Sequence, residues 1–143
     1  MKLLHNFCSF ILLSFCLIQP VIADSHDDLL SRANALIQQH KVNQAHQLLA
    51  PIADEHAGEP EFDSVYATIL LALKQHTLAA LTLERILIMR PDDLKTQLRL
   101  LQTYQQLKNF DLAQPLLQTI KQHPDYIKQT QSKTVAQVKR PLY

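Results

Sequence analysis

Two basic side chains beside two amides are the clearest candidates for binding chemistry in this sequence. Lys95 and Arg99 lie four residues apart, so a helix places them on one face about one turn from each other, next to Gln102 and Gln106. An arginine grips a carboxylate through two parallel hydrogen bonds, and a lysine adds a compact positive charge. This spacing predicts a face that binds an acidic or C-terminal peptide segment. The alternative is that both cations are ordinary solvated surface charges.

Catalytic chemistry has little support in the sequence. The histidines are scattered, and His40 and His46, six residues apart, do not share a helical face. Capping and the helix dipole account for carboxylates near expected loops and helix starts, and no serine has the motif context of a nucleophile. We therefore expect no enzyme activity, no metal site and no cofactor, and a hydrolase is the weakest class considered.

Residues 1–23 have the layout of a cleavable export signal. Lys2 precedes an apolar run from Phe7 to Ile18, then Pro20 breaks the run and a small residue, Ala23, stands at the expected cut. The run is short for a membrane span, so an uncleaved anchor is the less favoured alternative. We expect export to the periplasm, a mature chain that starts at Asp24, and no membrane span after cleavage.

The composition of this expected mature chain excludes several kinds of site and partner. Both cysteines, Cys8 and Cys16, leave with the signal, so disulfides, Cys-ligated zinc and cysteine nucleophiles are excluded. The chain would carry 13 acidic and 13 basic side chains, and this balance argues against binding to nucleic acid or to a membrane surface. The charges are segregated, with a balance of −6 in residues 24–93 and +6 in residues 94–143. A partner protein would experience this dipole.

The remaining pattern is helical. Leu, Ala and Gln abound, there is one glycine, Gly58, and strand-like alternation is almost absent. The periodicity predicts helices, joined by short connections, at 26–39, 42–57, 60–73, 76–90, 92–107 and 110–122. Pro51 should kink its helix, and Pro115 should sit in a first turn. Residues 124–143 carry a weaker pattern and form either a further helix or a tail.

The predicted helices repeat at a fixed interval along the chain, because Ala45 aligns with Ala79 and Ala113. Four further columns repeat in the same register: Leu49, Leu83 and Leu117; Ile52, Ile86 and Ile120; Ala33, Ala67 and Leu101; Leu36, Leu70 and Tyr104. The interval matches the tetratricopeptide repeat, a helix pair with a period of about 34 residues. The prediction is an all-α, tetratricopeptide-like α-solenoid of about three helix-turn-helix repeats over residues 24–123. The alternative is an irregular helical bundle whose leucines align by chance.

A more specific resemblance spans residues 48–117. The motif "GEPEFD" at the entry to the second repeat and "LER" before its closing Pro91 are similar to the periplasmic tetratricopeptide portion of the surface lipoprotein assembly modifier family. In that family the helical portion precedes an outer-membrane β-barrel that helps lipoproteins reach the cell surface. We expect this chain, which ends at Tyr143, to lack the barrel. The resemblance therefore implies the recognition module alone, as a stand-alone protein, half of a split system or a truncated relic.

Solenoids of this kind usually bind ligands in a groove lined by the first helix of each pair. The expected groove positions are Leu30, Asn34, Ile37, Ser64, Thr68, Leu71, Lys95, Arg99, Gln102 and Gln106. Asn34, Lys95 and Arg99 resemble three of five positions in the carboxylate clamp of chaperone-adaptor tetratricopeptide domains, whereas Leu30 and Val65 depart from the other two. The predicted partner-binding residues are Asn34, Thr68, Lys95, Arg99, Gln102 and Gln106.

The function predicted from these observations is protein–protein interaction in the periplasm. The chain would bind a polypeptide through its groove, with a link to outer-membrane lipoprotein or envelope assembly. The alternative is a scaffold subunit of an envelope complex that has no peptide-binding groove. A polar, ligand-sized groove would favour peptide binding, and an exposed apolar patch on the opposite side would favour the scaffold.

Overall fold

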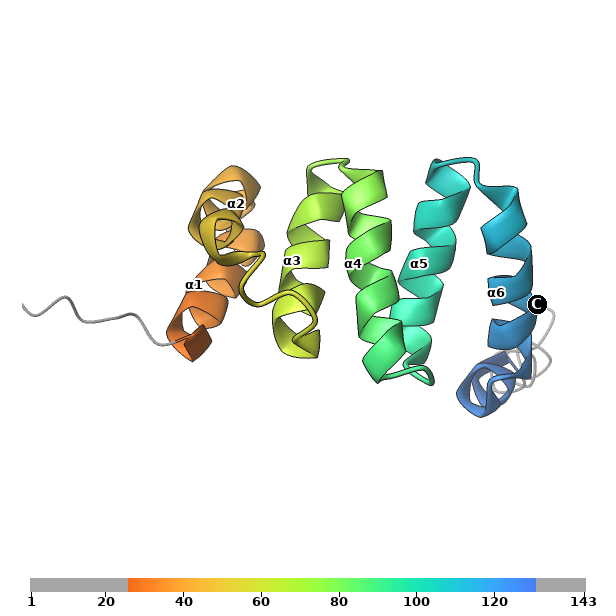
Figure 1. Ribbon diagram of the computed structural model, residues 1–143. Helices are drawn as coiled ribbons and strands as arrows, with labels where there is room; N and C mark the ends of the chain where they lie inside the picture. The colour runs from red at the N-terminus through yellow and green to blue at the C-terminus, as the bar shows by residue number, and fades with distance from the viewer. Residues whose placement is uncertain (1–25, 131–143) are drawn as a thin grey trace, which may run out of the picture.

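The computed structural model describes residues 26–130, and all regular elements in this part of the chain are helices, without strands. The elements are α1 (His26–Gln38), α2 (Val42–Leu49), the 3₁₀-helix η1 (Ala50–Ile52), α3 (Pro60–Ala72), α4 (His76–Met89), α5 (Leu94–Gln106) and α6 (Phe110–Gln122). The α-helices stand side by side in chain order (Figure 1). Within residues 26–130, none of the helices has the length and apolar character that crossing a membrane requires. The expected export signal lies outside the described residues.

The prediction for the second helix was wrong at its C-terminal end. It was expected to reach residue 57 with a kink at Pro51, but α2 ends at Leu49 and Pro51 lies in the short η1. Proline has no N–H for the next α-helical hydrogen bond, and the start of a 3₁₀ turn tolerates this loss. The following turn, residues 53–59, includes Gly58 at φ +97° and leads the chain into α3.

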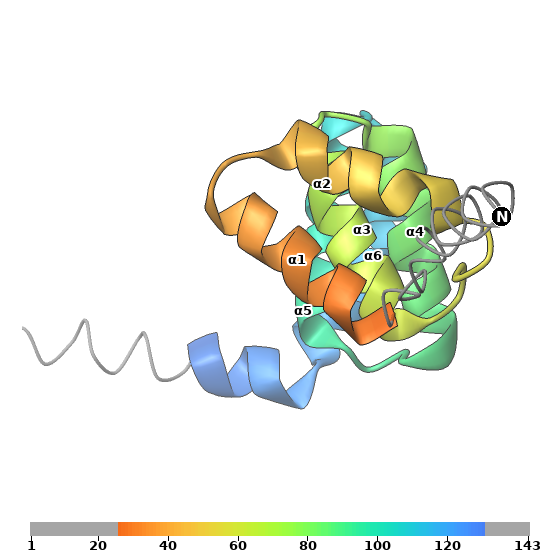
Figure 2. The same cartoon turned by 90° about the vertical axis from the view of Figure 1, so that its left-hand side faces the viewer.

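The C-terminal part differs from the prediction in the position of Pro115 and continues as a helix after α6. Pro115 is the sixth residue of α6 and so lies in its second turn, not in the first turn as predicted. Residues 124–130 are helical, and Tyr126 packs against the core, so the first part of the predicted tail is a helix. Figure 2 shows this segment, in blue, extending away from the helix stack on the side of α1 and α5. Residues 131–143 lie outside the described part.

The helix boundaries recur at the interval seen in the sequence. Helices α1, α3 and α5 begin at His26, Pro60 and Leu94, and α2, α4 and α6 begin at Val42, His76 and Phe110. The turn within each pair has the same backbone, with positive φ at His40 (60°), Lys74 (60°) and Lys108 (56°). In each turn an N–H bonds to a carbonyl five residues earlier: Lys41 to Leu36, Gln75 to Leu70 and Asn109 to Tyr104, all at 2.9 Å. This geometry closes a helix C-terminus by the Schellman pattern.

The side chains that recur at the same interval form much of the core. Ala45 and Ala79 are fully buried and Ala113 is 5% exposed, so small residues stand where the two helices of a pair pack closely. The members of the other columns are buried or packed against buried residues. The core forms two adjoining clusters, one around α1, α2 and α3 and the other extending from α3 to α6. Burial thus follows the same repeat register as the backbone.

An ion pair between a buried carboxylate and a partly exposed arginine fixes the entry to α3. Asp63 is fully buried and accepts hydrogen bonds from Arg85 of α4, through Nε to Oδ2 (3.1 Å) and through Nη2 to Oδ1 (2.6 Å). The hydrogen bond with Asp63 raises the pKa of Arg85 above its usual value. The N–H of Gly58 also donates to Asp63 Oδ2 at 3.0 Å. A single carboxylate therefore holds both α4 and the turn before α3, which satisfies the condition for burying a charge.

Candidate functional site beside helix α5

Helix α5 carries the largest share of the predicted binding residues, and Asp93 sets where the helix begins. The Asp93 side chain accepts hydrogen bonds from the N–H of Thr96 (3.2 Å) and from Thr96 Oγ1 (2.8 Å), as an N-cap residue should. Burial opposes ionisation of Asp93, but the hydrogen bonds from Thr96 hold its pKa below the usual value. With its first turn fixed, α5 exposes Lys95 and places Arg99 at an intermediate depth.

Arg99 is fixed by a neighbouring helix. Its Nη2 donates to Thr68 Oγ1 of α3 at 2.8 Å, and the same hydroxyl donates to the carbonyl of Ser64 at 2.8 Å. Burial lowers the pKa of Arg99, and the negative charge of Asp93 acts in the opposite direction. Two predicted binding residues, Arg99 and Thr68, are thereby brought into direct contact. The guanidinium is oriented before any ligand arrives.

The hollow beside the N-terminal half of α5, here called the proximal groove, is large and open. It has a volume of about 1120 Å³ and is bounded by α5 and the helical segment 124–130. Three cations and three carboxylates line it: Lys95, Arg99, Lys128, Asp92, Asp93 and Asp125. The charge there is balanced, because the loop before α5 and the segment after α6 contribute acids beside the cations of α5.

A second hollow, here called the distal groove, continues toward the C-terminal end of α5. It has a volume of about 400 Å³ and is lined by Leu71, His76, Thr103, Arg99 and three glutamines, Gln102, Gln105 and Gln106. Among the described residues that line it, Arg99 is the only lysine, arginine or carboxylate. Because Arg99 and Gln102 line both grooves, the two hollows meet at these side chains. Arg99 is therefore the one cation of the predicted pair, Lys95 and Arg99, that lines both hollows.

The six predicted residues do not all share this site. Lys95, Arg99, Gln102 and Gln106 line the two grooves, and Thr68 lies behind Arg99 as its hydrogen-bond partner. Asn34 of α1 is exposed and lines neither groove. Of the clamp-like set, Lys95 and Arg99 therefore share the proximal groove, and Asn34 lines neither of the two grooves.

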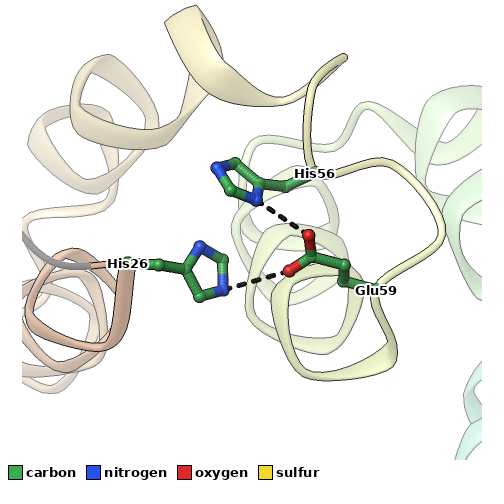
Figure 3. A group of neighbouring side chains, drawn as sticks. All are labelled: His26, His56 and Glu59. Carbon is green, nitrogen blue, oxygen red and sulfur yellow. Dashed lines mark hydrogen bonds and ion pairs between the residues drawn. The ribbon is translucent and has the colours of Figure 1, made fainter.

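Sequence reasoning missed a cluster at the other end of the described chain. His26 at the start of α1 and His56 and Glu59 in the turn before α3 converge, as Figure 3 shows. His26 Nε2 lies 3.3 Å and His56 Nδ1 lies 3.0 Å from the two carboxylate oxygens of Glu59. The repeat register contained a usable signal, since His26 and Pro60 hold equivalent positions and Glu59 immediately precedes Pro60.

These features define an all-α protein of successive helix pairs with two adjoining grooves on one helix, which charged and amide side chains help to line. No family model, curated protein or solved structure matches the chain. The residues of the grooves and the geometry that positions them are therefore the features that bear on function.

Proposed function

We propose that this protein is a tetratricopeptide-like α-solenoid of three helix-turn-helix repeats that binds an extended polypeptide segment along α5. The solenoid assignment is supported by helix starts, turn conformations and buried columns that all recur at one common interval. In such arrays the first helices of successive pairs line the ligand-binding face. The two grooves lie on α5, which is the first helix of the third pair and therefore belongs to the expected ligand-binding face.

The observation that carries the proposal is the position of Arg99 at the junction of the two grooves. Thr68 uses one N–H of the guanidinium, and within residues 26–130 no other acceptor engages it. A guanidinium has five N–H donors, so Arg99 can still grip a carboxylate. A free C-terminus or an acidic side chain of the bound segment is the matching group.

The glutamines extend this recognition from a single carboxylate to a peptide backbone. Gln102, Gln105 and Gln106 line the distal groove, and each amide can donate to a peptide carbonyl and accept from a peptide N–H. The proximal groove, with its balanced charges, accommodates a segment of mixed charge. The proposed ligand is therefore an extended segment with its carboxylate at Arg99 and its backbone along the glutamines.

The proposed setting is the periplasm, with an envelope protein or lipoprotein as the partner. The layout of residues 1–23 and the resemblance to the helical portion of the surface lipoprotein assembly modifier family support this setting. Mass spectrometry of the protein recovered from the periplasmic fraction should find Asp24 as the first residue. Recovery of the uncleaved chain in the membrane fraction would contradict it.

A scaffold role is the second candidate, and exposed apolar side chains on the second helices favour it. Leu78 and Leu81 of α4 are each 51% exposed, and Phe110 and Leu112 of α6 are 59% and 47% exposed. Exposed apolar side chains of this size are typical of protein contacts when they are contiguous. This role would place the partner on α4 and α6, not on α5.

Site-specific photo-crosslinking in the native envelope distinguishes the two roles. A photoreactive residue replaces Gln106 in the distal groove or, as the matched control, Leu81 on α4; both side chains are exposed. Peptide binding predicts a crosslinked partner at position 106, with the crosslink on an extended segment of that partner. A partner that crosslinks only at position 81 would contradict peptide binding and favour the scaffold.

A further inference from the structure

The cluster of His26, His56 and Glu59 is built on a rigid support. The rings of His26 and His56 stack on Phe62, with centroid distances of 5.9 and 5.3 Å, and Phe62 is fully buried. The turn that carries His56 and Glu59 is held at Gly58, whose N–H bonds to the buried Asp63 at 3.0 Å. Both imidazoles therefore face Glu59 from positions that the core fixes (Figure 3).

The distances within the cluster suit a metal ion. Ligand atoms bonded to zinc at about 2.0–2.1 Å in a tetrahedron lie about 3.3 Å apart. His26 Nε2 lies 3.3 Å from Glu59 Oε2 and His56 Nδ1 lies 3.0 Å from Glu59 Oε1, and one ligand atom from each residue can be chosen so that all three lie within 4.8 Å of one another. Because the imidazoles contact different carboxylate oxygens, binding one ion would require side-chain shifts of about 1–2 Å to reach the spacing that these bond lengths set.

The donor chemistry selects the class of ion. Two imidazole nitrogens and one carboxylate suit zinc and similar transition metals, whereas calcium and magnesium prefer sites made of oxygen atoms alone.

We propose that His26, His56 and Glu59 bind a divalent ion of the zinc class, with water in the fourth position. The ion would tie the start of α1 to the turn before α3. It would therefore stabilise the N-terminal helix pair against separation from the rest of the stack. This site shares no residue with the grooves on α5, so its test is independent of the proposed peptide binding.

The test uses Zn²⁺ and Co²⁺ on the purified protein after treatment with a chelator. Copper and nickel are avoided because of a competing site. In a chain that begins at Asp24, His26 would be the third residue, and a free N-terminal amine followed by a histidine at the third position binds these two ions without His56 or Glu59. Isothermal titration with Zn²⁺ should give one ion per chain. Co²⁺ should give the visible absorption bands of a tetrahedral ion, and the melting temperature should rise by several degrees when Zn²⁺ is about 100-fold above its dissociation constant.

Single substitutions identify the ligands. His26→Gln, His56→Gln and Glu59→Gln should each weaken Zn²⁺ binding by about tenfold or more, because even the loss of an outer-shell partner costs that much. The matched control is His40→Asn, which removes an exposed histidine at a positive φ that asparagine tolerates. It should leave Zn²⁺ affinity unchanged.

Two results would overturn the proposal. One is a melting temperature that Zn²⁺ does not change, which would make the cluster a hydrogen-bond network only. The other is Zn²⁺ binding that the three substitutions weaken no more than His40→Asn does, which would mark it as adventitious binding to surface histidines. Circular dichroism of each variant shows whether it is folded, and only folded variants enter this comparison.

Discussion

At the scale of single residues, Arg99 has both a structural contact and capacity for a ligand. The sequence alone was sufficient to place Lys95 and Arg99 on one helical face, because their spacing and a helical context decide it. It was not sufficient to distinguish them, because the hydroxyl of Thr68 that holds Arg99 lies 31 residues away in the chain. Exposed Lys95 and half-buried Arg99 therefore have different expected energetic roles.

This difference predicts unequal effects of two alanine substitutions on stability. Arg99→Ala should lower the free energy of unfolding by about 1 kcal/mol, because it removes the hydrogen bond to Thr68. Lys95→Ala should change it by less than about 0.5 kcal/mol, as is usual for an exposed charge. Urea unfolding followed by circular dichroism measures both. Equal effects would show that Arg99 does not hold Thr68 in solution.

The cap of α5 gives a prediction about pH. The hydrogen bonds from Thr96 hold the pKa of Asp93 below 3.8, so its contribution to stability is present at neutral pH and is lost as the pH falls through the folded-state pKa. Asp93→Ala should therefore cost about 1 kcal/mol at pH 7. The difference between parent and variant should shrink below about pH 4. Urea unfolding at pH 7 and at the lowest pH where both proteins fold measures it, and a difference that grows on acidification would contradict the cap.

At the scale of elements, hydrophobic periodicity was sufficient for most helices but not for the end of α2. A proline in a helical pattern either kinks or ends the helix, and the choice depends on packing that a local pattern does not contain. Pro51 ends α2, so residues 53–59 form a turn and bring His56 and Glu59 to His26. Because the local pattern does not show where α2 ends, it also does not show that His26 and His56 come together, and the histidines look scattered in the sequence.

The recurrent turns give a prediction at this scale. Lys74 has φ 60°, a conformation that costs a side-chain-bearing residue about 1–2 kcal/mol. Lys74→Gly removes this cost but gives the unfolded chain more conformational entropy, which offsets part of the gain. The net effect should be a stabilisation of about 0.5 kcal/mol. Gln118→Gly, at an exposed position inside α6, is the control and should destabilise by about 1 kcal/mol. Thermal or urea unfolding compares them, and destabilisation by Lys74→Gly would argue against this turn geometry.

At the scale of the whole molecule, the repeat period of the sequence predicted both the order of the helices and the main buried columns. The division of charge between residues 24–93 and 94–143 did not carry over to the grooves, because chain segments before and after α5 contribute Asp92, Asp93 and Asp125 to the proximal groove. The resulting site has one cation that both hollows share, Arg99, between a charge-balanced hollow and an amide-lined hollow. Its expected selectivity is for a carboxylate in one place and not for acidic chains in general.

The most direct test is the affinity of the crosslinked partner segment for variants of Arg99. The segment is synthesised with its carboxylate intact and in an amide form, and fluorescence anisotropy at low salt measures binding. Arg99→Gln should weaken binding of the carboxylate form by at least about tenfold, because hydrogen bonds to charged groups are worth about 1.5–3 kcal/mol. It should affect the amide form little. Lys121→Gln, which removes one exposed positive charge from α6, is the control and should leave both affinities unchanged. If Arg99→Gln binds the carboxylate form as tightly as the parent does, α5 is not the binding site.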